Sequence, residues 1–581
     1  MTRGWRRVRF GGDRLMVGFA LVAALYLLLP PLLLTVYSAL RTPANRLPFE
    51  EGTSWGLSNL TDLYTSGALL NTVVDTSVFV GGSVAVAMVV GFAIAWLVER
   101  TNLPFRNGVF VLVLFPLMMP GIVTTMGWLL LLTERTGMVN VALRAVLPVW
   151  DQGPFDVFSM YGMVVVQGVS LVALAFIFVS AGLRNMDPVL EDASRVSGAS
   201  ALATFRRITL PVLWPGVLGA ALVTAILTVE SFEVPLLLAG GANADIFSSR
   251  LYFALNDASG GAPAYGTVAA LGLHFLVFTY ALIFVYHRLT GRGERYVTLT
   301  GRGYHQRRQA LGGWRWPVSA VVGGFLLLTS IGPFLVLVWT SLLPQYMPPG
   351  AAAFERLSFD QYTQLFSDGR LVSAWVNTVV VAVVAPTIAV FVTILLAWVV
   401  IRAKKMRRLP LLLDQFLTSS LAIPSVVAAN AFLLFYLQLN RALPNWVPLF
   451  GTILVLVLVY AYRMAVAYRM NHAGVVQISV ELEDASSASG ASRATTFFRI
   501  VLPLALPSVV GVWVLLFLVA FRELTLPLVV GRESPPFVVS VLIWKLWAQH
   551  AGQAAALGVL TVVFLSSIVL GLRLLVFRRF R

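Results

Sequence analysis

Long apolar runs, separated by short polar segments, follow one another along the whole chain. Each run reaches the roughly 20 residues that an α-helix needs to cross the hydrocarbon layer of a bilayer. The runs are continuous and do not alternate between apolar and polar positions, which favours helices over the strands of a membrane barrel. We therefore expect an all-α polytopic membrane protein with about 12 transmembrane helices. Their expected ranges are 15–39, 69–98, 109–133, 159–183, 212–239, 264–287, 317–343, 373–401, 410–438, 448–470, 506–530 and 551–577.

Prolines fall inside several of these ranges. Pro116 and Pro120 are predicted to break the helix expected at 109–133, because proline removes a backbone donor and clashes with the preceding turn. Pro30 and Pro31 lie inside the first range, where neighbouring helices can satisfy the carbonyl groups that they release.

Basic residues gather in the polar segments that we place on the cytoplasmic side, as is typical of membrane proteins. The N-terminal segment, the loop with Arg100 and Arg106, the loop Arg402–Arg408 and the C-terminal VFRRFR are the clearest cases. Both termini are therefore expected in the cytoplasm. The segment 291–316 is rich in Gly and Arg and poor in apolar residues, so we interpret it as a cytoplasmic linker.

A 22-residue stretch occurs twice. Leu190–Pro211 reads LEDASRVSGASALATFRRITLP, and Leu482–Pro503 reads LEDASSASGASRATTFFRIVLP. The polar positions repeat as well as the apolar ones, and Asn71–Val74 is likewise matched by Asn377–Val380. The chain is thus predicted to contain two pseudo-symmetric six-helix halves, 1–290 and 317–581, on either side of the linker.

Each repeated stretch has the signals of a short helix, a bend and a second helix. Asp187 and Ser479 can cap the first helix, Pro188 suits its first position, and the acidic residues that follow favour its positive end. Gly198 and Gly490 interrupt that helix. The second helix is expected to end at Leu210-Pro211 and Leu502-Pro503, before the next membrane helix. An even number of crossings separates the copies, so both are placed at the cytoplasmic surface, where another protein can grip them.

Composition excludes several other functions. The chain has 581 residues, of which 58% are hydrophobic and 12% charged, with a net charge of +16. That charge is what cytoplasmic loops carry, so no nucleic acid is expected as a partner. There is no cysteine, and the five histidines lack metal-ligand spacing, so no metal site is expected. No G-x₄-G-K-[ST] loop and no cluster typical of catalysis occurs, so the chain is not expected to hydrolyse ATP or to be an enzyme.

Four charged residues fall inside predicted membrane helices. They are Glu230 and Glu233 after the first repeated stretch, and Arg522 and Glu523 after the second. Embedded charges are costly, usually pair, and often mark a transport pathway. One hypothesis places them along a translocation path, with Arg522 countering one or more glutamates. The other is a structural ion pair near the outer ends of the helices.

The repeated stretch resembles the EAA loop of ABC-importer permeases, E-A-A-x₃-G-x₉-I-x-L-P. Both copies depart from it with Asp for Glu and with Ser194 or Ser486 for the second Ala, and a preceding glutamate keeps the acidic character. In that family the loop forms a coupling helix that fits a groove on a cytoplasmic ATPase. The candidate ATPase-coupling residues are Glu191, Asp192, Ala193, Gly198, Ile208, Leu210, Pro211, Glu483, Asp484, Ala485, Gly490, Ile500, Leu502 and Pro503.

The resemblance covers essentially the whole chain and implies the type I ABC-importer fold, in a bacterial cytoplasmic (inner) membrane. It implies two copies of an ABC ATPase that bind ATP and Mg, and a periplasmic or lipid-anchored substrate-binding protein. No cofactor is expected in this chain itself.

Two halves fused in one chain of this size resemble ferric-iron transport permeases, which implies iron(III) as the cargo. Thiamine, polyamines, phosphonates or sugar phosphates remain alternatives. A secondary transporter or channel, which can also contain repeats, is the alternative of another class, and a polytopic membrane enzyme is a third.

Overall fold

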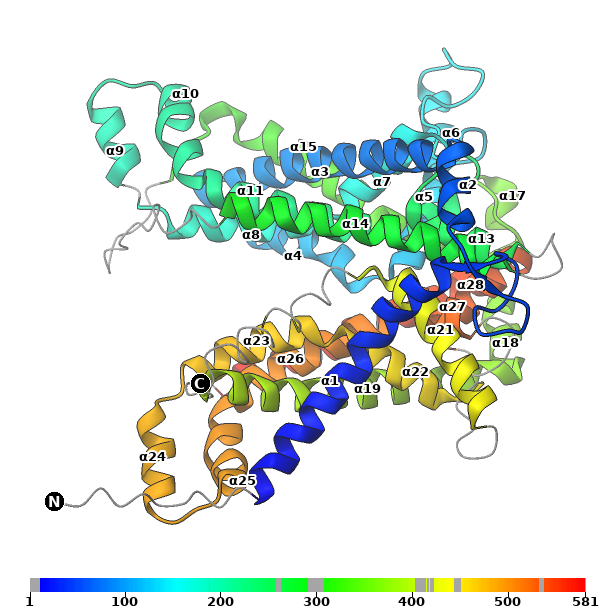
Figure 1. Ribbon diagram of the computed structural model, residues 1–581. Coiled ribbons are helices and arrows are strands. Elements are labelled where there is room, and N and C mark those ends of the chain that lie inside the picture. The colour runs from blue at the N-terminus through cyan, green and yellow to red at the C-terminus, as the bar shows by residue number, and fades with distance from the viewer. Residues whose placement is uncertain are drawn as a thin grey trace. The chain divides into compact units, whose positions relative to one another are not determined.

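The structure of this chain is a computed structural model. It describes residues 11–187, 189–257, 263–290, 308–402, 414, 417, 423–443, 451–531 and 538–579. The described part is almost entirely helical (Figure 1), and the strands in it, β1 (Arg41–Thr42) and β2 (Ser54–Trp55), form one antiparallel pair. Eight of its helices are long and apolar enough to cross a membrane, or up to ten if each of two bent pairs is one span. The expected all-α polytopic fold is confirmed.

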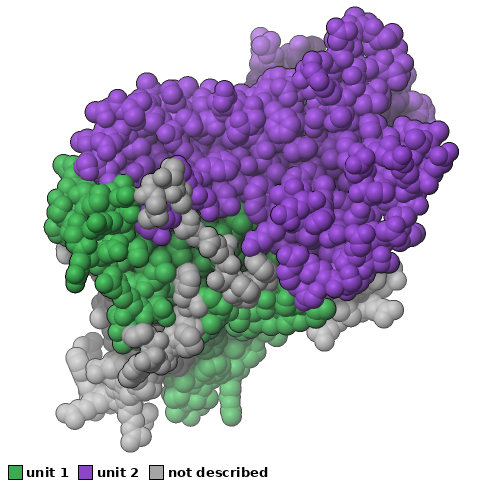
Figure 2. Space-filling view, turned by 90° about the vertical axis from the view of Figure 1, so that its right-hand side faces the viewer, with its two compact units in different colours: residues 1–57, 372–538 green, residues 58–371, 539–581 purple. Residues whose placement is uncertain are grey.

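The chain divides into two compact units, and each draws on separate parts of the sequence (Figure 2). Unit 1 contains Met1–Leu57 and Val372–Val538, and unit 2 contains Ser58–Leu371 and Val539–Arg581. The first helix of the sequence therefore packs with helices of the second half. The compact units do not coincide with the two sequence halves that the repeat predicts. That sequence division stays a prediction, and residues 291–307 of the linker lie outside the described residues.

Unit 2 contains the helices of the first half other than the first one, the first helices of the second half and the last two helices of the chain. Its helices are α2 (Ser58–Thr65), α3 (Ala68–Arg100), α4 (Arg106–Leu114), α5 (Gly121–Leu132), α6 (Met138–Val146), α7 (Met160–Ser170), α8 (Val172–Asn185), α9 (Val189–Val196), α10 (Ala201–Thr204), α11 (Leu210–Val229), α12 (Glu233–Leu238), α13 (Phe247–Asn256), α14 (Tyr265–Thr290), α15 (Arg315–Leu326), α16 (Gly332–Ser341), α17 (Ala351–Phe354), α18 (Asp360–Ser367), α28 (Val539–Gln549) and α29 (Ala551–Arg579).

Unit 1 combines the first helix of the chain with the middle helices of the second half. Its helices are α1 (Gly11–Ala39), α19 (Gly369–Arg402), α21 (Ser425–Ala442), α22 (Ile453–Tyr460), α23 (Met464–Val476), α24 (Val480–Ala488), α25 (Arg493–Thr496), α26 (Leu502–Arg522) and α27 (Thr525–Val530). Helix α19 begins at the boundary with unit 2. Helix α1 packs against α21 and α25, and it contains Pro30 and Pro31 without interruption.

The predicted break at Pro116 and Pro120 is confirmed. The 3₁₀ turn η1 (Phe115–Met118) follows α4, and the direction changes by 107° before α5 continues. The span expected at 159–183 is also bent, by 45°, between α7 and α8.

Two other expected spans are interrupted where we predicted continuous helices. The range 212–239 divides into α11 and α12, and 506–530 divides into α26 and α27. Pro235 and Pro527 explain both breaks, because a proline ring clashes with the carbonyl group four residues earlier, here at Ser231 and Glu523. Each break falls at that residue or directly beside it.

Three of the remaining expected spans differ in detail. The range 317–343 contains the π-helical turn η5 (Leu327–Ile331) between α15 and α16, and 448–470 contains the 3₁₀ turn η7 (Ala461–Arg463) between α22 and α23. Of the range 410–438, α21 covers the part from Ser425 onward, and most of the residues before Ile423 lie outside the described residues.

Close packing inside unit 2 depends on small residues. At Gly91 of α3, an added Cβ would lie 2.7 Å from Ala175 Cβ and 3.0 Å from the backbone nitrogen of Phe176 on α8. Small residues let membrane helices approach closely, because lipid supplies little hydrophobic drive for their association.

Across the two sequence halves, the Tyr346 hydroxyl donates to the backbone oxygens of Leu130 and Thr136, at 2.9 and 2.8 Å. Burial raises the pKa of this phenol to about 12.

Two helices are longer than a membrane is thick. Helices α3 and α19 have 33 and 34 residues. At 1.5 Å per residue each is about 50 Å long, whereas the hydrocarbon layer measures about 30 Å. Their ends therefore extend beyond the hydrocarbon or the helices tilt strongly. Both helices end in an arginine, Arg100 or Arg402, at the end of the unit where the repeated stretch lies.

Candidate functional site

Both repeated stretches fold as two short antiparallel helices joined at a glycine. In the first copy, α9 and α10 lie side by side at one end of unit 2, and in the second, α24 and α25 do so at one end of unit 1 (Figure 1). Gly198 has φ +83° and Gly490 has φ +82°, the left-handed conformation that favours glycine. The predicted helix, bend and helix is confirmed in both copies. We name them the first and second docking elements, residues 187–211 and 479–503.

The predicted helix caps are confirmed. Asp187 Oδ1 accepts a hydrogen bond from the amide of Val189 at 2.9 Å, and Ser479 Oγ accepts one from the amide of Glu481 at 3.2 Å. Each cap satisfies an amide that a helix start leaves without an intrahelical partner. Pro188, expected at the first helical position, lies outside the described residues.

The predicted stop at Leu210-Pro211 and Leu502-Pro503 is wrong. In both copies the second short helix continues through a π-helical turn, η2 (Phe205–Thr209) or η8 (Phe497–Val501), directly into α11 or α26. The proline lacks the amide that an α-helix would use at that point, and the wider π-turn before it accommodates the change. The second short helix of each docking element is thus continuous with a membrane helix.

The serine that replaces alanine in both copies has a structural role. Ser194 Oγ lies 2.9 Å from Thr204 Oγ1, and Ser486 Oγ lies 2.8 Å from Thr496 Oγ1. Each hydroxyl pair joins the two short helices across the glycine bend. The departure from the alanine of the family pattern therefore comes with a matching threonine ten residues later.

The adjacent acidic pair in each docking element has one inward and one outward residue. Glu191 and Glu483 are buried, with 5% and 8% of their surface exposed. Asp192 is half-buried and Asp484 is exposed. The two glutamates thus point into the protein, whereas the aspartates at the first position of the family pattern lie nearer the surface.

Glu483 forms several bonds to the end of α19. Its Oε1 accepts from Arg402 Nε and lies 2.8 Å from Arg402 Nη2, and its Oε2 accepts from Trp398 Nε1 at 3.0 Å. In the first copy, Glu191 Oε1 accepts from Thr209 Oγ1 at 2.8 Å and lies 3.7 Å from Arg100 Nε at the end of α3. Both pairs join a docking element to the last residue of a long membrane helix.

The tryptophan and arginine of this contact were not identified from the sequence. Trp96 stands four residues before Arg100, and Trp398 four residues before Arg402. The Trp96 ring lies 5.1 Å from Phe205, and the Trp398 ring 5.3 Å from Phe497, at the start of each π-turn. The signal that could have found them is this repeated W-x₃-R at the ends of two matching helices. Arg100 was assigned to a basic loop, but it is the last residue of α3 and is 4% exposed.

The outward surface of the docking elements carries apolar side chains. Ala193 and Ala485 are exposed, as are Leu190 and Leu482 at matching positions, and Ile208 and Ile500 are half-buried in the π-turns. Val196, with 89% exposed, lies beside the first glycine bend. An apolar surface with a few carboxylates is suited to binding another protein.

The charged residues of the membrane helices lie in both units. In unit 1, Glu523 Oε2 lies 2.8 Å from Arg463 Nη2, and its Oε1 accepts from the amides of Thr525 and Leu526 at the start of α27. Arg463 also donates to Ser425 Oγ. The pair borders a cavity lined by Pro386, Ala389 and Tyr460 among others. Arg463 was not identified from the sequence, although it lies in the expected span 448–470 together with Arg469.

In unit 2, Glu230 follows the last residue of α11, and Glu233 is the first residue of α12. A Cβ at Gly121, the first residue of α5, would lie 2.9 Å from Glu233 Cδ, so the carboxyl group lies against that helix start. The N-terminal ends of helices favour negative charge. Arg522 is the last residue of α26 in unit 1.

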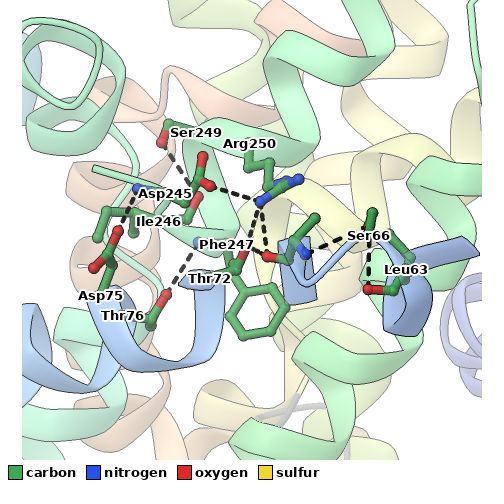
Figure 3. Close-up of polar contacts among 11 residues, drawn as sticks. Leu63, Ser66, Thr72, Asp75, Thr76, Asp245, Ile246, Phe247, Ser249 and Arg250 are labelled. Carbon is green, nitrogen blue, oxygen red and sulfur yellow. Dashed lines mark hydrogen bonds and ion pairs between the residues drawn. The ribbon is translucent and has the colours of Figure 1, made fainter. Parts of the chain in front are cut away.

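A further polar cluster holds the start of α13 to α3 at the opposite end of unit 2 from the first docking element (Figure 1). Asp75 Oδ2 accepts from the amide of Asp245, and Thr76 Oγ1 accepts from the amide of Phe247 (Figure 3). Arg250 donates to Thr72 Oγ1 and pairs with Asp245 at 2.8 Å. These contacts hold a loop in place. Over the described residues, no group of three or more His, Cys, Asp or Glu is placed to hold a metal ion.

Comparison with known proteins assigns a family. A family model described as "Binding-protein-dependent transport system inner membrane component" matches residues 87–293 and again 389–581, and each match contains one docking element. A ferric transport system permease protein FbpB of Actinobacillus pleuropneumoniae is 23% identical over 90% of this chain and 73% of its own. A putative ferric transport system permease protein FbpB 1 of Haemophilus influenzae is 24% identical over 82% of this chain and 73% of its own.

A probable ABC transporter permease protein of Sinorhizobium fredii, y4fN, is 24% identical over 86% of this chain and 85% of its own. Among solved structures, a bacterial ABC transporter that imports the acidic polysaccharide alginate matches with a TM-score of 0.35 and 19% identity, over 42% of this chain and 86% of that chain. From the two family matches, we conclude that the chain belongs to the binding-protein-dependent transport system inner membrane components and is a multi-pass permease of an ABC importer with two fused halves.

Proposed function

We propose that this permease imports iron(III), driven by two copies of a cytoplasmic ABC ATPase that bind the two docking elements. The observation that carries the ATPase proposal is the repetition of the whole docking geometry. Glycine bend, hydroxyl pair, buried glutamate and π-turn occur in both copies. Two equivalent surfaces on one chain favour two equivalent partners. ATP and Mg bind to those partners, and this chain supplies the transport path.

The proposal for the cargo is supported by the relatives. Two permeases named for ferric transport match most of this chain. A periplasmic or lipid-anchored binding protein delivers the iron and performs most of the selection. Thiamine, polyamines, phosphonates and sugar phosphates are the other cargo classes against which iron(III) has to be tested.

The membrane orientation is part of the proposal. Both termini and both docking elements lie in the cytoplasm, and the chain resides in the bacterial inner membrane. The basic residues of the N-terminal segment, of Arg402–Arg408 and of the C-terminal tail support this orientation, since positive charge is retained on the cytoplasmic side.

The translocation path is proposed to pass the charged breaks of the membrane helices, at Glu230 and Glu233 in unit 2 and at Arg522 and Glu523 in unit 1. The small cavity beside Glu523 and Arg463 supports this assignment, because these two charged groups and Tyr460 line it. The ion pair itself favours the structural hypothesis for Glu523, so the two roles need a direct test.

The proposed function is tested in liposomes that contain the permease, a candidate ABC ATPase from the same organism and a candidate binding protein. Binding protein loaded with radioactive iron(III) should give uptake of iron into the liposomes. This uptake should require ATP on the side of the membrane where the docking elements lie. Uptake of thiamine or another cargo with ATP, but not of iron, would contradict the cargo alone. Uptake that follows an ion gradient and ignores ATP would contradict the importer and indicate a secondary transporter.

A further inference from the structure

We propose that Glu191 and Glu483 are positioning residues that fasten each docking element to the end of a long membrane helix. Through Arg100 or Arg402, a movement of the docking element would reach α3 or α19 in addition to the helix that continues from it. This inference rests on the proposed function, because it needs an ATPase that moves the docking elements. It gives the two glutamates a role different from direct contact with the ATPase.

The covalent chain alone does not supply this connection. The first docking element lies between α8 and α11 in the sequence, and the second lies between α23 and α26. Helices α3 and α19 precede them by many residues, and polar side-chain contacts join each helix to a docking element. The buried carboxylate is therefore the polar contact through which a push on the short helices is transmitted to α3 or α19.

The second copy has the stronger connection. One carboxylate oxygen of Glu483 receives two nitrogens of Arg402 at 2.8 Å each, and the other receives the Trp398 indole at 3.0 Å. Arg402 Nη2 also donates to the backbone oxygen of Ile478 at 2.9 Å, just before α24. Charge-assisted bonds of this kind are short and directional, so they define the angle between helix and docking element.

The first copy shares the arginine partner, but a threonine takes the place of the tryptophan as the second donor. Glu191 accepts its short bond from Thr209, on the π-turn, while Arg100 lies 3.7 Å away. Arg100 and Glu191 are both nearly fully buried, so they interact in a medium of low dielectric. The carboxylate therefore joins three elements, α9, the π-turn and α3, at a single point.

The end of α3 has a second connection that α9 does not provide. The backbone oxygen of Arg100 accepts from the amide of Gln309 at 2.9 Å, and the Asn102 amide donates to the Gln309 oxygen at 3.1 Å. Asn102 Oδ1 accepts from the amide of Leu311 at 2.9 Å. Residues 309–311 lead into α15 of the second sequence half. The anchor of the first docking element is thus bonded to the chain that continues into the other half.

The test uses the complete complex of permease, ATPase and binding protein in liposomes, with Glu483→Gln as the main variant. The glutamine keeps the size of the side chain but removes the charge that Arg402 requires. We expect the iron(III) transported per ATP hydrolysed to fall roughly tenfold, within the range of coupling energies between distant sites. ATP hydrolysis and co-purification of the ATPase should remain close to those of the unchanged protein. Glu191→Gln should cause a smaller fall.

Two control variants lie outside the docking elements. Glu355→Gln removes an exposed carboxylate that follows α17. Arg184→Gln removes the partner of Glu99, at 2.7 Å, in an ion pair between α8 and α3 that does not involve the docking element. Both should leave the ratio of transport to ATP hydrolysis unchanged. A general loss of folding would instead lower transport and ATP hydrolysis together.

Cross-linking provides a second test that does not depend on the stability of Glu483→Gln. Since the chain has no cysteine, Arg402→Cys with Glu483→Cys creates a unique pair of thiols. Transport per ATP should be low in the reduced protein and rise when a short bifunctional thiol reagent joins the two positions.

Three results would overturn the inference. One is a normal ratio of transport to ATP hydrolysis in Glu483→Gln, and another is the same ratio in the linked and unlinked cysteine pair. Loss of the ATPase from Glu483→Gln during purification would indicate a docking contact instead. If the unchanged complex shows no ATP-dependent uptake at all, the proposed function fails as well.

Discussion

The glycine at each docking bend is required for its conformation and not for space. Gly198 and Gly490 have positive φ values, and nothing lies within 4 Å of a Cβ built at either position. A side chain would fit there, but an L-residue pays roughly 1–2 kcal/mol in the left-handed region. Asparagine adopts this region more readily than other residues.

This predicts different outcomes for two substitutions at one site. Gly490→Val should straighten or strain the bend and lower ATP-dependent uptake, whereas Gly490→Asn should keep most of it. Uptake by reconstituted protein measures the difference, and membrane insertion of both variants serves as the control. Equal, full transport by the two variants would show that the bend does not matter for coupling.

Variants of Arg463 and Glu523 can distinguish a role in the translocation path from a purely structural ion pair. Removing one partner of a buried ion pair leaves an uncompensated charge, which typically costs about 3–5 kcal/mol. Glu523→Gln alone should therefore lower the melting temperature, and Arg463→Gln with Glu523→Gln should recover much of it.

If these residues line the path, the double variant stays slow in transport although it is stable again. A double variant that is stable and transports normally would leave only the structural role. The same assay on Arg522→Gln tests the predicted counter-charge separately.

At the residue level, the sequence predicted the features that depend on near neighbours. The caps at Asp187 and Ser479 and the bend at Gly490 follow from local chemistry and are present. The partners of Glu191 and Glu483 could not be predicted, because Arg100 and Arg402 lie far away in the sequence. Their positive charge was attributed to the cytoplasmic loops. The buried ion pairs with Glu191 and Glu483 were therefore not predicted.

At the level of elements, hydropathy located the helices but did not find all their breaks. Two ranges predicted as single helices, 212–239 and 506–530, are each divided. Apolar residues on both sides of a break raise the mean hydropathy across it, so the average does not detect the interruption. The position of Pro235 and Pro527 is the better signal, since the clash of each ring falls on the residue four positions earlier.

Helix α3 permits a matched test of close packing. Gly91 lies against α8, with 2.7 Å between an added Cβ and Ala175, while nothing lies within 4 Å of Gly81 in the same helix. Gly91→Leu should force α3 and α8 apart and cost about 1–3 kcal/mol or more. Gly81→Leu makes the same chemical change without that contact.

Thermal unfolding in detergent compares the two variants. Gly91→Leu should melt at a lower temperature than the unchanged protein, and Gly81→Leu should melt at or above its temperature, because leucine is the better helix former. Equal melting of the two variants would contradict the close contact of α3 with α8.

At the level of the whole molecule, the repeat predicted two copies of one unit, and the family comparison matches the chain twice. The repeat could not predict which helices pack together, because both halves carry the same apolar pattern. In the structure, α1 of the first half joins unit 1, and α15 and α16 of the second half join unit 2. Each compact unit therefore contains helices from both halves.

Because each compact unit contains helices from both sequence halves, the two halves should associate even when the linker between them is cut. We expect residues 1–300 and 301–581, expressed as two chains in one cell, to co-purify and to restore ATP-dependent uptake. Affinity purification through a tag on one chain measures this, with the tagged half expressed alone as control. Recovery of either half alone in a stable form, without its partner, would contradict the interleaved packing.

The same packing sets an order of events during synthesis. Tyr26 of α1 shares a 2.9 Å hydrogen bond with Tyr436 of α21, a residue 410 positions later. At roughly 5–20 residues per second, the ribosome needs on the order of 20–80 s to make that partner. Until then α1 lacks the tertiary partner that α21 supplies. A helix made early in synthesis therefore reaches this neighbour only after most of the chain has been made.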